Sequence, residues 1–506
     1  MKRSHVTLIG LSCLALAATG CPKAKKKTPS AGSGTAVTQP AKPTKPTKPA
    51  EPTKPTKPAK PAPAAKTVKL PPPANFDKAA MPDPWDSVAE VKAACDKNLK
   101  EAEALKKTIL ATKGPRTLAS TLVPYNKLLI HLDHVIPMSE LIFNVHPQKA
   151  VRKAAEKCAR RAKKFESALK LNKGLYEALK GVKADGLKPL DKRFLSHLMR
   201  DYRRAGVDRD DKTRKKLAAL DAKMVKLGQN FSRNIRNDKR SIQVTEAQLD
   251  GLPKDFIAAA KKKAKGKKLT LTTDYPSFYP VISYAKDESV RKAIYKAFLS
   301  RAYPKNEKVL KDLLTARHTY ATTLGYPDWA AYNAEDKMVK KKEVIADFLA
   351  KIVKLARPRM VADLKDVHAR KKKDDPKAAA PGVWDRFYYI NKLRAERFGV
   401  NPAEVRSYFE FNAVKKGVLD TVQKMFAITF KKVEAKVWHP SVEAYDIYDR
   451  GKRIARFFLD LYPRKGKYGH AAEFSMYTGI PGVQLPMASL VTNFPNPKTS
   501  SGPALT

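Results

Sequence analysis

Apolar residues recur with a helical period through most of the chain beyond residue 86. Val88, Val91, Cys95 and Leu99 follow the 3.6-residue spacing of one helix face, and Asp86 is the predicted N-cap. Further long helices are predicted at 115–145, 151–165, 190–204, 212–236, 287–301, 305–324 and 342–368. Helices of this length suit stacked helical architectures. The pattern therefore predicts a mainly α fold.

Several short stretches break the helical period. The predicted strands are 241–244, 269–272, 437–449, 453–462 and 491–494. The first two lie on either side of a basic helix at 255–268, and Gly451 supplies a turn between the third and fourth. Residues 479–483 are predicted to form a loop. The sequence thus predicts small sheets within a helical fold.

The N-terminus has the pattern of a lipoprotein signal. Lys2 and Arg3 precede an apolar run at 6–18, which is too short to span a bilayer. The run ends in small residues before Cys21, in a sequence that resembles a lipobox. We therefore expect cleavage before Cys21, acylation of its thiol and lipid anchoring at a bacterial cell envelope. A plain secretory signal is the alternative.

A low-complexity segment follows the signal. Its Lys-Pro-Thr and Lys-Pro-Ala repeats cannot bury a core, and proline favours an extended spacer. Apart from the signal run, no stretch is predicted to be long and apolar enough to form a membrane helix. The predicted organisation is a signal peptide at 1–20, a tether at 21–75, an N-terminal helical lobe at 76–240, and a second segment at 241–506.

The formal net charge of +52 predicts attraction to polyanions. Because lysines are spread over the whole chain, a generally basic surface is the plainer interpretation. The Lys-rich tether is the predicted contact for anionic lipid or polymer. The basic cluster around Lys261 lacks interleaved aromatic residues, so specific nucleic-acid binding is not predicted.

Two cysteines, Cys95 and Cys158, lie beyond the predicted signal and lipobox. In an exported protein they could form a disulfide. Both lie at helical spacing among apolar residues, which favours two buried thiols. The sequence leaves the pairing open.

Several blocks resemble, in order, the thimet oligopeptidase and oligopeptidase A family of zinc metallopeptidases. They include 200–206, 227–234, 437–442, 460–472 and 486–494. The resemblance implies a two-lobed, long-helix scaffold with a small sheet lining a deep channel, short peptides as substrates, and zinc. By resemblance, His470, Val491, Asn493 and Phe494 approach that channel.

The metal chemistry of that family requires a His-Glu-x-x-His motif on a helix and a further Glu ligand. The nine histidines include no such pair, and the chain stops at Thr506, just before the motif is expected. His131 and His134 have a spacing that suits a metal, but a solvated helix face is the plainer interpretation. No Gly-x-Ser-x-Gly motif or phosphate loop is present.

We therefore expect no catalytic or metal-ligating residue in this chain, and a scaffold truncated at its C-terminus that is inactive alone. Two alternatives remain open. One is a non-catalytic peptide-binding envelope lipoprotein, and the other is a surface protein that binds polyanions through charge alone.

Overall fold

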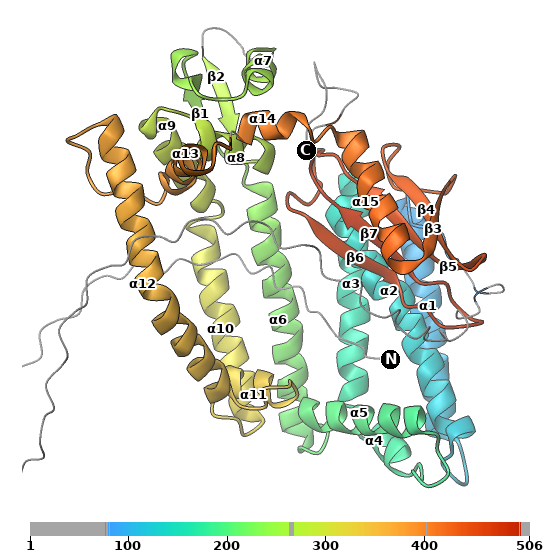
Figure 1. The fold of residues 1–506 in the computed structure, drawn as a ribbon. Coiled ribbons are helices and arrows are strands. Elements are labelled where there is room, and N and C mark those ends of the chain that lie inside the picture. The colour runs from blue at the N-terminus through green and yellow to red at the C-terminus, as the bar shows by residue number, and fades with distance from the viewer. Residues whose placement is uncertain are drawn as a thin grey trace, which may run out of the picture. The chain divides into compact units, whose positions relative to one another are not determined.

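The computed structural model describes residues 76, 79, 81–262, 268–400, 402–494 and 496. Fifteen α-helices and seven strands occupy this part of the chain (Figure 1). The predicted mainly helical fold with small sheets is confirmed. The predicted signal peptide at 1–20 and the whole tether at 21–75, with Cys21, lie outside the described residues.

The first helices of the described chain agree closely with the hydrophobic pattern. Their bounds are α1 Val88–Ala111, α2 Val123–Val145, α3 Lys149–Lys170, α4 Lys173–Lys180, α5 Pro189–Ala205 and α6 Asp211–Asn237. The cap of α1 is Ser87, whose side chain accepts from the backbone N–H of Glu90, and not Asp86. The residue before a proline is pushed out of the helical region, and α2 accordingly ends before Pro147.

The predicted helix start at Pro115 is wrong. A short π-helical turn, Leu118–Leu122, precedes α2 instead. Thr117 caps this turn, because its hydroxyl accepts from the backbone N–H of Ser120 and the Ser120 hydroxyl accepts from the N–H of Thr117. The reciprocal cap satisfies N–H groups that a helix end leaves unpaired.

Cys95 of α1 and Cys158 of α3 form a disulfide. The preference for two buried thiols is therefore wrong. Both sulfurs belong to the buried core, and their Cα atoms lie 5.9 Å apart. The two cysteines face each other across the contact between α1 and α3. Helical spacing shows that each side chain is buried, but it does not show that the two meet.

The segment Leu118–Val145 is long and apolar enough to cross a membrane by length and composition, contrary to the expectation that no such stretch exists. Half of its most apolar window is buried inside the protein. Leu128, Val135 and Leu141 are completely buried, in cores shared with α1 and α3. The apolar character of this segment is therefore used in packing between helices.

The first sheet is a two-stranded antiparallel ribbon. Its strands, β1 Ser241–Val244 and β2 Leu269–Thr272, lie where the sequence predicts them. The helix between them, α7, spans Lys254–Lys262. Two following helices, α8 Tyr275–Tyr284 and α9 Glu288–Leu299, share an apolar core with the ribbon.

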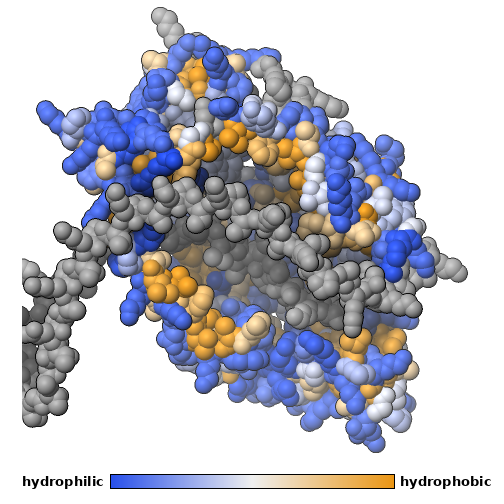
Figure 2. Space-filling view, viewed as in Figure 1, coloured by the Kyte–Doolittle hydropathy of each residue, from blue (hydrophilic) through white to orange (hydrophobic). Residues whose placement is uncertain are grey.

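The remaining helices are α10 Lys305–Thr323, α11 Trp329–Glu335, α12 Lys342–Asp374, α13 Arg386–Phe398, α14 Pro402–Ser407 and α15 Phe411–Phe426. The helix α12 is unusual because much of its apolar surface is exposed. Phe348 is 61% exposed and Leu355 is 67% exposed. Figure 2 shows apolar patches interrupting a mostly hydrophilic surface.

The second sheet has five strands in the order β3-β4-β5-β7-β6. Their bounds are β3 Ile428–Val433, β4 Glu443–Asp449, β5 Lys452–Asp460, β6 Ala472–Tyr477 and β7 Met487–Val491. The pair β5–β7 is parallel and the other pairs are antiparallel. The turn at Gly451, which has a φ of +79°, is confirmed.

The sequence missed β3 and β6 and misplaced the last strand. The predicted strand at 491–494 is wrong, because β7 ends at Val491. In β7, Met487, Ser489 and Val491 alternate as buried positions, as a strand packed on one face requires.

One apolar core joins the two ends of the described chain. It contains Val135 and Met138 of α2 together with Phe458 of β5 and Met476 of β6. On the other face of the sheet, Phe411 of α15 packs in a separate core. The division at residue 240 stays a prediction, since the first core contains residues from both sides of it.

Candidate functional site

The strand β6 lies at one end of the five-stranded sheet. Its inner edge pairs with β7, and no other described strand pairs with its outer edge. Glu473 and Ser475 are exposed, whereas Met476 is buried in the core. One edge of β6 therefore offers backbone N–H and C=O groups to another extended chain.

A buried cluster of charges holds the connection between β5 and β6. The carboxylate of Asp460, at the end of β5, accepts hydrogen bonds from Arg464 at 2.6 Å and from the indole N–H of Trp438 at 2.8 Å. The ammonium of Lys467 lies 2.8 Å from the same carboxylate. Asp460 and Arg464 thus form a structural ion pair.

The electrostatics of this cluster favour an ionised Asp460. Burial raises the pKa of Asp460, but the hydrogen bond from Arg464 and the charge of Lys467 outweigh it and lower the pKa overall. Because the ionised carboxylate is paired and hydrogen-bonded, the cluster can fix the start of the loop that leads to β6.

This loop carries His470, one of the predicted channel residues. The His470 side chain is exposed, and its ring meets that of Tyr275 edge to face, with centroids 4.8 Å apart. The side-chain amide of Asn493 donates to the backbone carbonyls of Tyr468 and His470. The structure thus brings His470 and Asn493 together and adds Tyr275, which sequence reasoning missed.

The other two predicted channel residues lie elsewhere. Val491 is fully buried in the core beneath the sheet. Phe494 is half-buried, and its ring packs against that of Phe411. The exposed side chains nearest to the edge strand are therefore those of His470, Glu473 and Ser475.

His131 and His134 do not form a solvated helix face, so that interpretation is wrong. Both Nδ1 atoms lie within hydrogen-bonding distance of the Asn98 side-chain oxygen, at 2.9 and 3.2 Å. His134 also contacts the side chain of Gln484, in the loop between β6 and β7.

Asp133, which lies between the two histidines on α2, contacts the same loop between β6 and β7. The carboxylate of Asp133 accepts from the backbone N–H of Thr478 at 2.9 Å and from the amide of Gln484 at 3.2 Å. This part of α2 therefore anchors the β6–β7 loop, and the polar residues here are used in packing.

Comparison with known proteins shows what the chain is similar to. Residues 281–506 match Peptidase family M3. The chain is 27% identical to thimet-like oligopeptidase of Dictyostelium discoideum over 83% of its own length, and 27% identical to oligopeptidase A of Escherichia coli over 82%. It is 28% identical to saccharolysin of Saccharomyces cerevisiae over 76% of its length. The chain is therefore similar to peptidase family M3 over its C-terminal part.

The chain spans 66% of the length of the Dictyostelium relative, 64% of the E. coli relative and 57% of saccharolysin. A solved structure of PZ peptidase A with inhibitor 2 aligns with a TM-score of 0.39 and 12% identity, over 83% of this chain and 61% of that one. The family resemblance read from the sequence blocks is confirmed.

The zinc chemistry expected of an M3 peptidase does not fit the residues of this chain. Its sequence has no His-Glu-x-x-His motif. Within the described ranges, no three His, Cys, Asp or Glu side chains come together in a group that could hold a metal ion. We therefore derive no catalytic step through zinc from this chain.

Proposed function

We propose that this chain contributes the peptide-binding wall of a metallo-oligopeptidase that hydrolyses short peptides. The proposal rests on the M3 match together with the unpaired outer edge of β6 in the described sheet. An extended peptide can add to such an edge through main-chain hydrogen bonds. His470 and Tyr275 supply an aromatic surface beside it.

The charge of the protein indicates which peptides the edge would favour. The formal net charge of +52 attracts acidic peptides over long distances at low salt. Main-chain pairing, in contrast, is short-range and resists screening. We therefore expect acidic peptides to associate faster, while the hydrogen bonds along β6 determine whether they stay bound.

We further propose that this chain does not hydrolyse peptides alone. Hydrolysis in a zinc peptidase needs a metal with an open position and a carboxylate base. The absence of the motif from the sequence supports this view. The zinc and the base would belong to residues other than those of this chain.

Fluorescence anisotropy with a labelled acidic octapeptide tests the binding proposal. We expect saturable binding by the purified chain, and no binding of the same peptide with every backbone amide N-methylated. Equal binding of both peptides would refute strand addition. Zinc content and hydrolysis, measured with and without a chelator, test the second proposal, which chelator-sensitive turnover would overturn.

A pair of substitutions tests whether the peptide binds at the edge of β6 or elsewhere on the surface. We expect His470→Ala to weaken octapeptide binding several-fold. His318→Ala is the matched control, because His318 is exposed on α10 and its side chain makes no hydrogen bond within the described structure. Equal effects of the two variants would place the bound peptide elsewhere.

The cell-envelope location remains a proposal. It rests on the signal-like N-terminus and on Cys21, which would carry the lipid. Two or more acyl chains would hold the protein firmly at a membrane. We expect Cys21→Ser to move the protein from the membrane fraction to the soluble fraction of the envelope. Retention of that variant at the membrane would contradict a lipid anchor at this residue.

Two alternative functions are compatible with the same observations. A non-catalytic peptide-binding lipoprotein predicts saturable binding with neither zinc nor turnover. A polyanion-binding surface protein follows from the net charge, with the Lys-rich tether as its predicted contact. Its binding would fall steeply with added salt, whereas salt-insensitive octapeptide binding would argue against it.

A further inference from the structure

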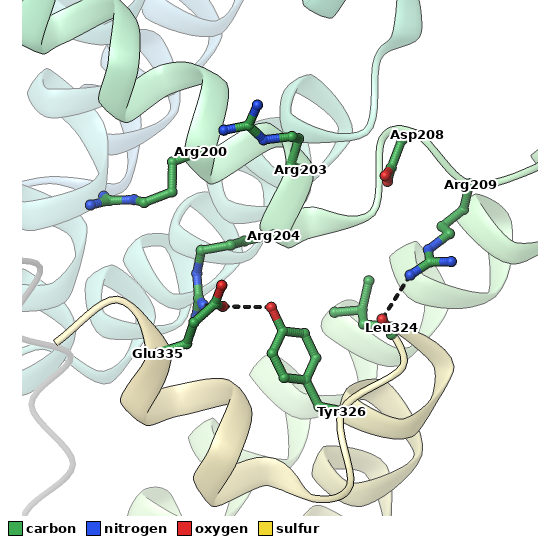
Figure 3. Close-up of a pocket in the computed structure, with 8 residues that line it drawn as sticks. All are labelled: Arg200, Arg203, Arg204, Asp208, Arg209, Leu324, Tyr326 and Glu335. Carbon is green, nitrogen blue, oxygen red and sulfur yellow. Dashed lines mark hydrogen bonds and ion pairs between the residues drawn. The ribbon is translucent and has the colours of Figure 1, made fainter. Parts of the chain in front are cut away.

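A cavity of about 250 Å³ opens where α5, the turn after it, the end of α10 and α11 meet (Figure 3). Four arginines line it: Arg200, Arg203, Arg204 and Arg209. Two carboxylates, Asp208 and Glu335, also line it, and two more, Asp201 and Asp336, lie 2.8 Å from Arg200 and 3.8 Å from Arg204. The cavity holds about eight waters at ~30 Å³ each, so its size suits a small ion better than an extended peptide.

The floor of the cavity is already neutralised. Arg204 forms an ion pair with Glu335 and donates to the backbone carbonyl of Tyr332 at 2.8 Å. Its guanidinium also lies over the Tyr332 ring, 4.5 Å from the centroid. The hydroxyl of Tyr326 donates to Glu335 as well. Arg204 and Glu335 therefore hold the wall together and are not available to a bound anion.

Arg200 is paired with Asp201 at 2.8 Å, but Arg203 and Arg209 have donors to spare. Arg203 is exposed and makes no side-chain hydrogen bond or ion pair with any residue that the structure describes. Arg209 donates one hydrogen bond, at 2.8 Å, to the carbonyl of Leu324 at the end of α10. Figure 3 draws no interaction from Arg200, Arg203 or Asp208 to the other residues shown.

We propose that this cavity binds a small phosphate-bearing anion. The planar guanidinium presents paired N–H donors that match phosphate oxygens, and such charge-assisted hydrogen bonds are the strong ones. Arg203 and Arg209 supply the donors, Arg200 is already paired with Asp201, and Asp208 opposes the anion. This proposal is independent of peptide binding at β6.

The competing explanation is that these arginines only offset helix dipoles. The C-termini of α5 and α10 both lie at the cavity, and cations are favourable at such ends. Arg209 on the Leu324 carbonyl fits that role. Under this explanation, Arg203→Ala changes stability slightly and changes anion binding no more than the loss of any other surface charge.

Titration calorimetry with inorganic pyrophosphate, in a chloride buffer, separates the two explanations. We expect Arg203→Ala to weaken binding roughly tenfold, as the loss of a hydrogen bond to a charged group implies. Arg193→Ala is the charge-matched control, because Arg193 is exposed on the same helix and does not line the cavity. It should change binding less than twofold.

A variant that is expected to bind pyrophosphate more tightly is also needed, because weaker binding by Arg203→Ala could result from misfolding. Asp208→Asn removes the unpaired carboxylate at the cavity and should tighten pyrophosphate binding several-fold. Equal weakening by Arg193→Ala and Arg203→Ala, or no effect of Asp208→Asn, would overturn the proposal, because binding would then follow overall charge.

A second arm distinguishes a free ion from a lipid headgroup. Binding to phosphatidylglycerol vesicles is measured with the same three variants. Dependence on Arg203 but not on Arg193 in this assay alone would support a phosphate presented by lipid. Dependence in the pyrophosphate assay alone would support a free anion. Dependence on Arg203 in neither assay would refute the site.

Discussion

The ammonium group of Lys467 lies 2.8 Å from a carboxylate oxygen of Asp460, and both side chains are completely buried. The same ammonium donates to the backbone carbonyls of Asp460, Tyr462 and Thr492, at 2.9, 2.6 and 2.8 Å. One side chain thus ties the end of β5, the following loop and the residue after β7 together. This arrangement fixes the segment that carries His470.

We expect Asp460→Asn to destabilise the protein by roughly 3–5 kcal/mol, because it leaves Lys467 and Arg464 buried without their counter-charge. Urea unfolding followed by circular dichroism measures the loss. Asp449→Asn is the control, since Asp449 pairs with its neighbour Arg450 at a surface turn. Similar unfolding midpoints for Asp460→Asn and the unsubstituted protein would contradict a structural role for the cluster.

The same residue predicts how stability depends on pH. The pKa of Asp460 and the pKa of Asp385 are both lower than the ordinary value of 3.8, since ion pairs outweigh the effect of burial. A lowered carboxyl pKa stabilises the fold above pH ~4, and that contribution is lost as pH falls through the folded-state pKa.

We therefore expect the urea midpoint to fall as the pH is lowered below about 4. The fall should be shallower in Asp460→Asn, which has lost one of the titrating groups. Parallel pH profiles for the two proteins would show that Asp460 does not contribute to the acid sensitivity.

The disulfide between Cys95 and Cys158 closes a long loop, with a sequence separation of 63. Loop closure of that length is worth about 4 kcal/mol in the chain-entropy account. We expect the double variant Cys95→Ala/Cys158→Ala to lose stability on that scale, and reductant to destabilise the unsubstituted protein but not the variant. Two reactive thiols at these positions in the unreduced, denatured protein would contradict the pairing.

The apolar side chains exposed on α12 predict association of the purified chain. Large exposed apolar patches bind partners or aggregate. We expect Phe348→Glu/Leu355→Glu to reduce dye binding by exposed apolar surface and to raise the concentration at which the protein associates. Lys351→Glu changes the charge by the same amount on the same helix, so equal effects would point to charge alone.

The helices could be predicted because their apolar period comes from local spacing. The short strand β6 could not, because its sequence, Ala-Glu-Phe-Ser-Met-Tyr, contains no β-branched residue. Its strand state depends on pairing with β7 and on burying Met476 against α2. The strand β3, in contrast, has a β-prone sequence, Ile-Thr-Phe-Lys-Lys-Val, that is typical of a strand.

The candidate site also depends on contacts between residues that are far apart in the sequence. The sequence pointed to His470 only through resemblance, and it could not show that Tyr275, far away in the chain, meets its ring. Val491 lies in a matching sequence block, yet burial removes it from any surface. The disulfide and the contacts of His134 with Gln484 likewise join segments whose proximity only the folded chain reveals.

The central claim is that an extended peptide lies along the outer edge of β6. Photo-cross-linking of a benzophenone-labelled octapeptide, followed by mass spectrometry, locates it directly. We predict cross-links concentrated within residues 470–477, and their loss in competition with the unlabelled octapeptide. Cross-links concentrated on α12, or scattered over lysine-rich surfaces and removed by salt, would contradict the account.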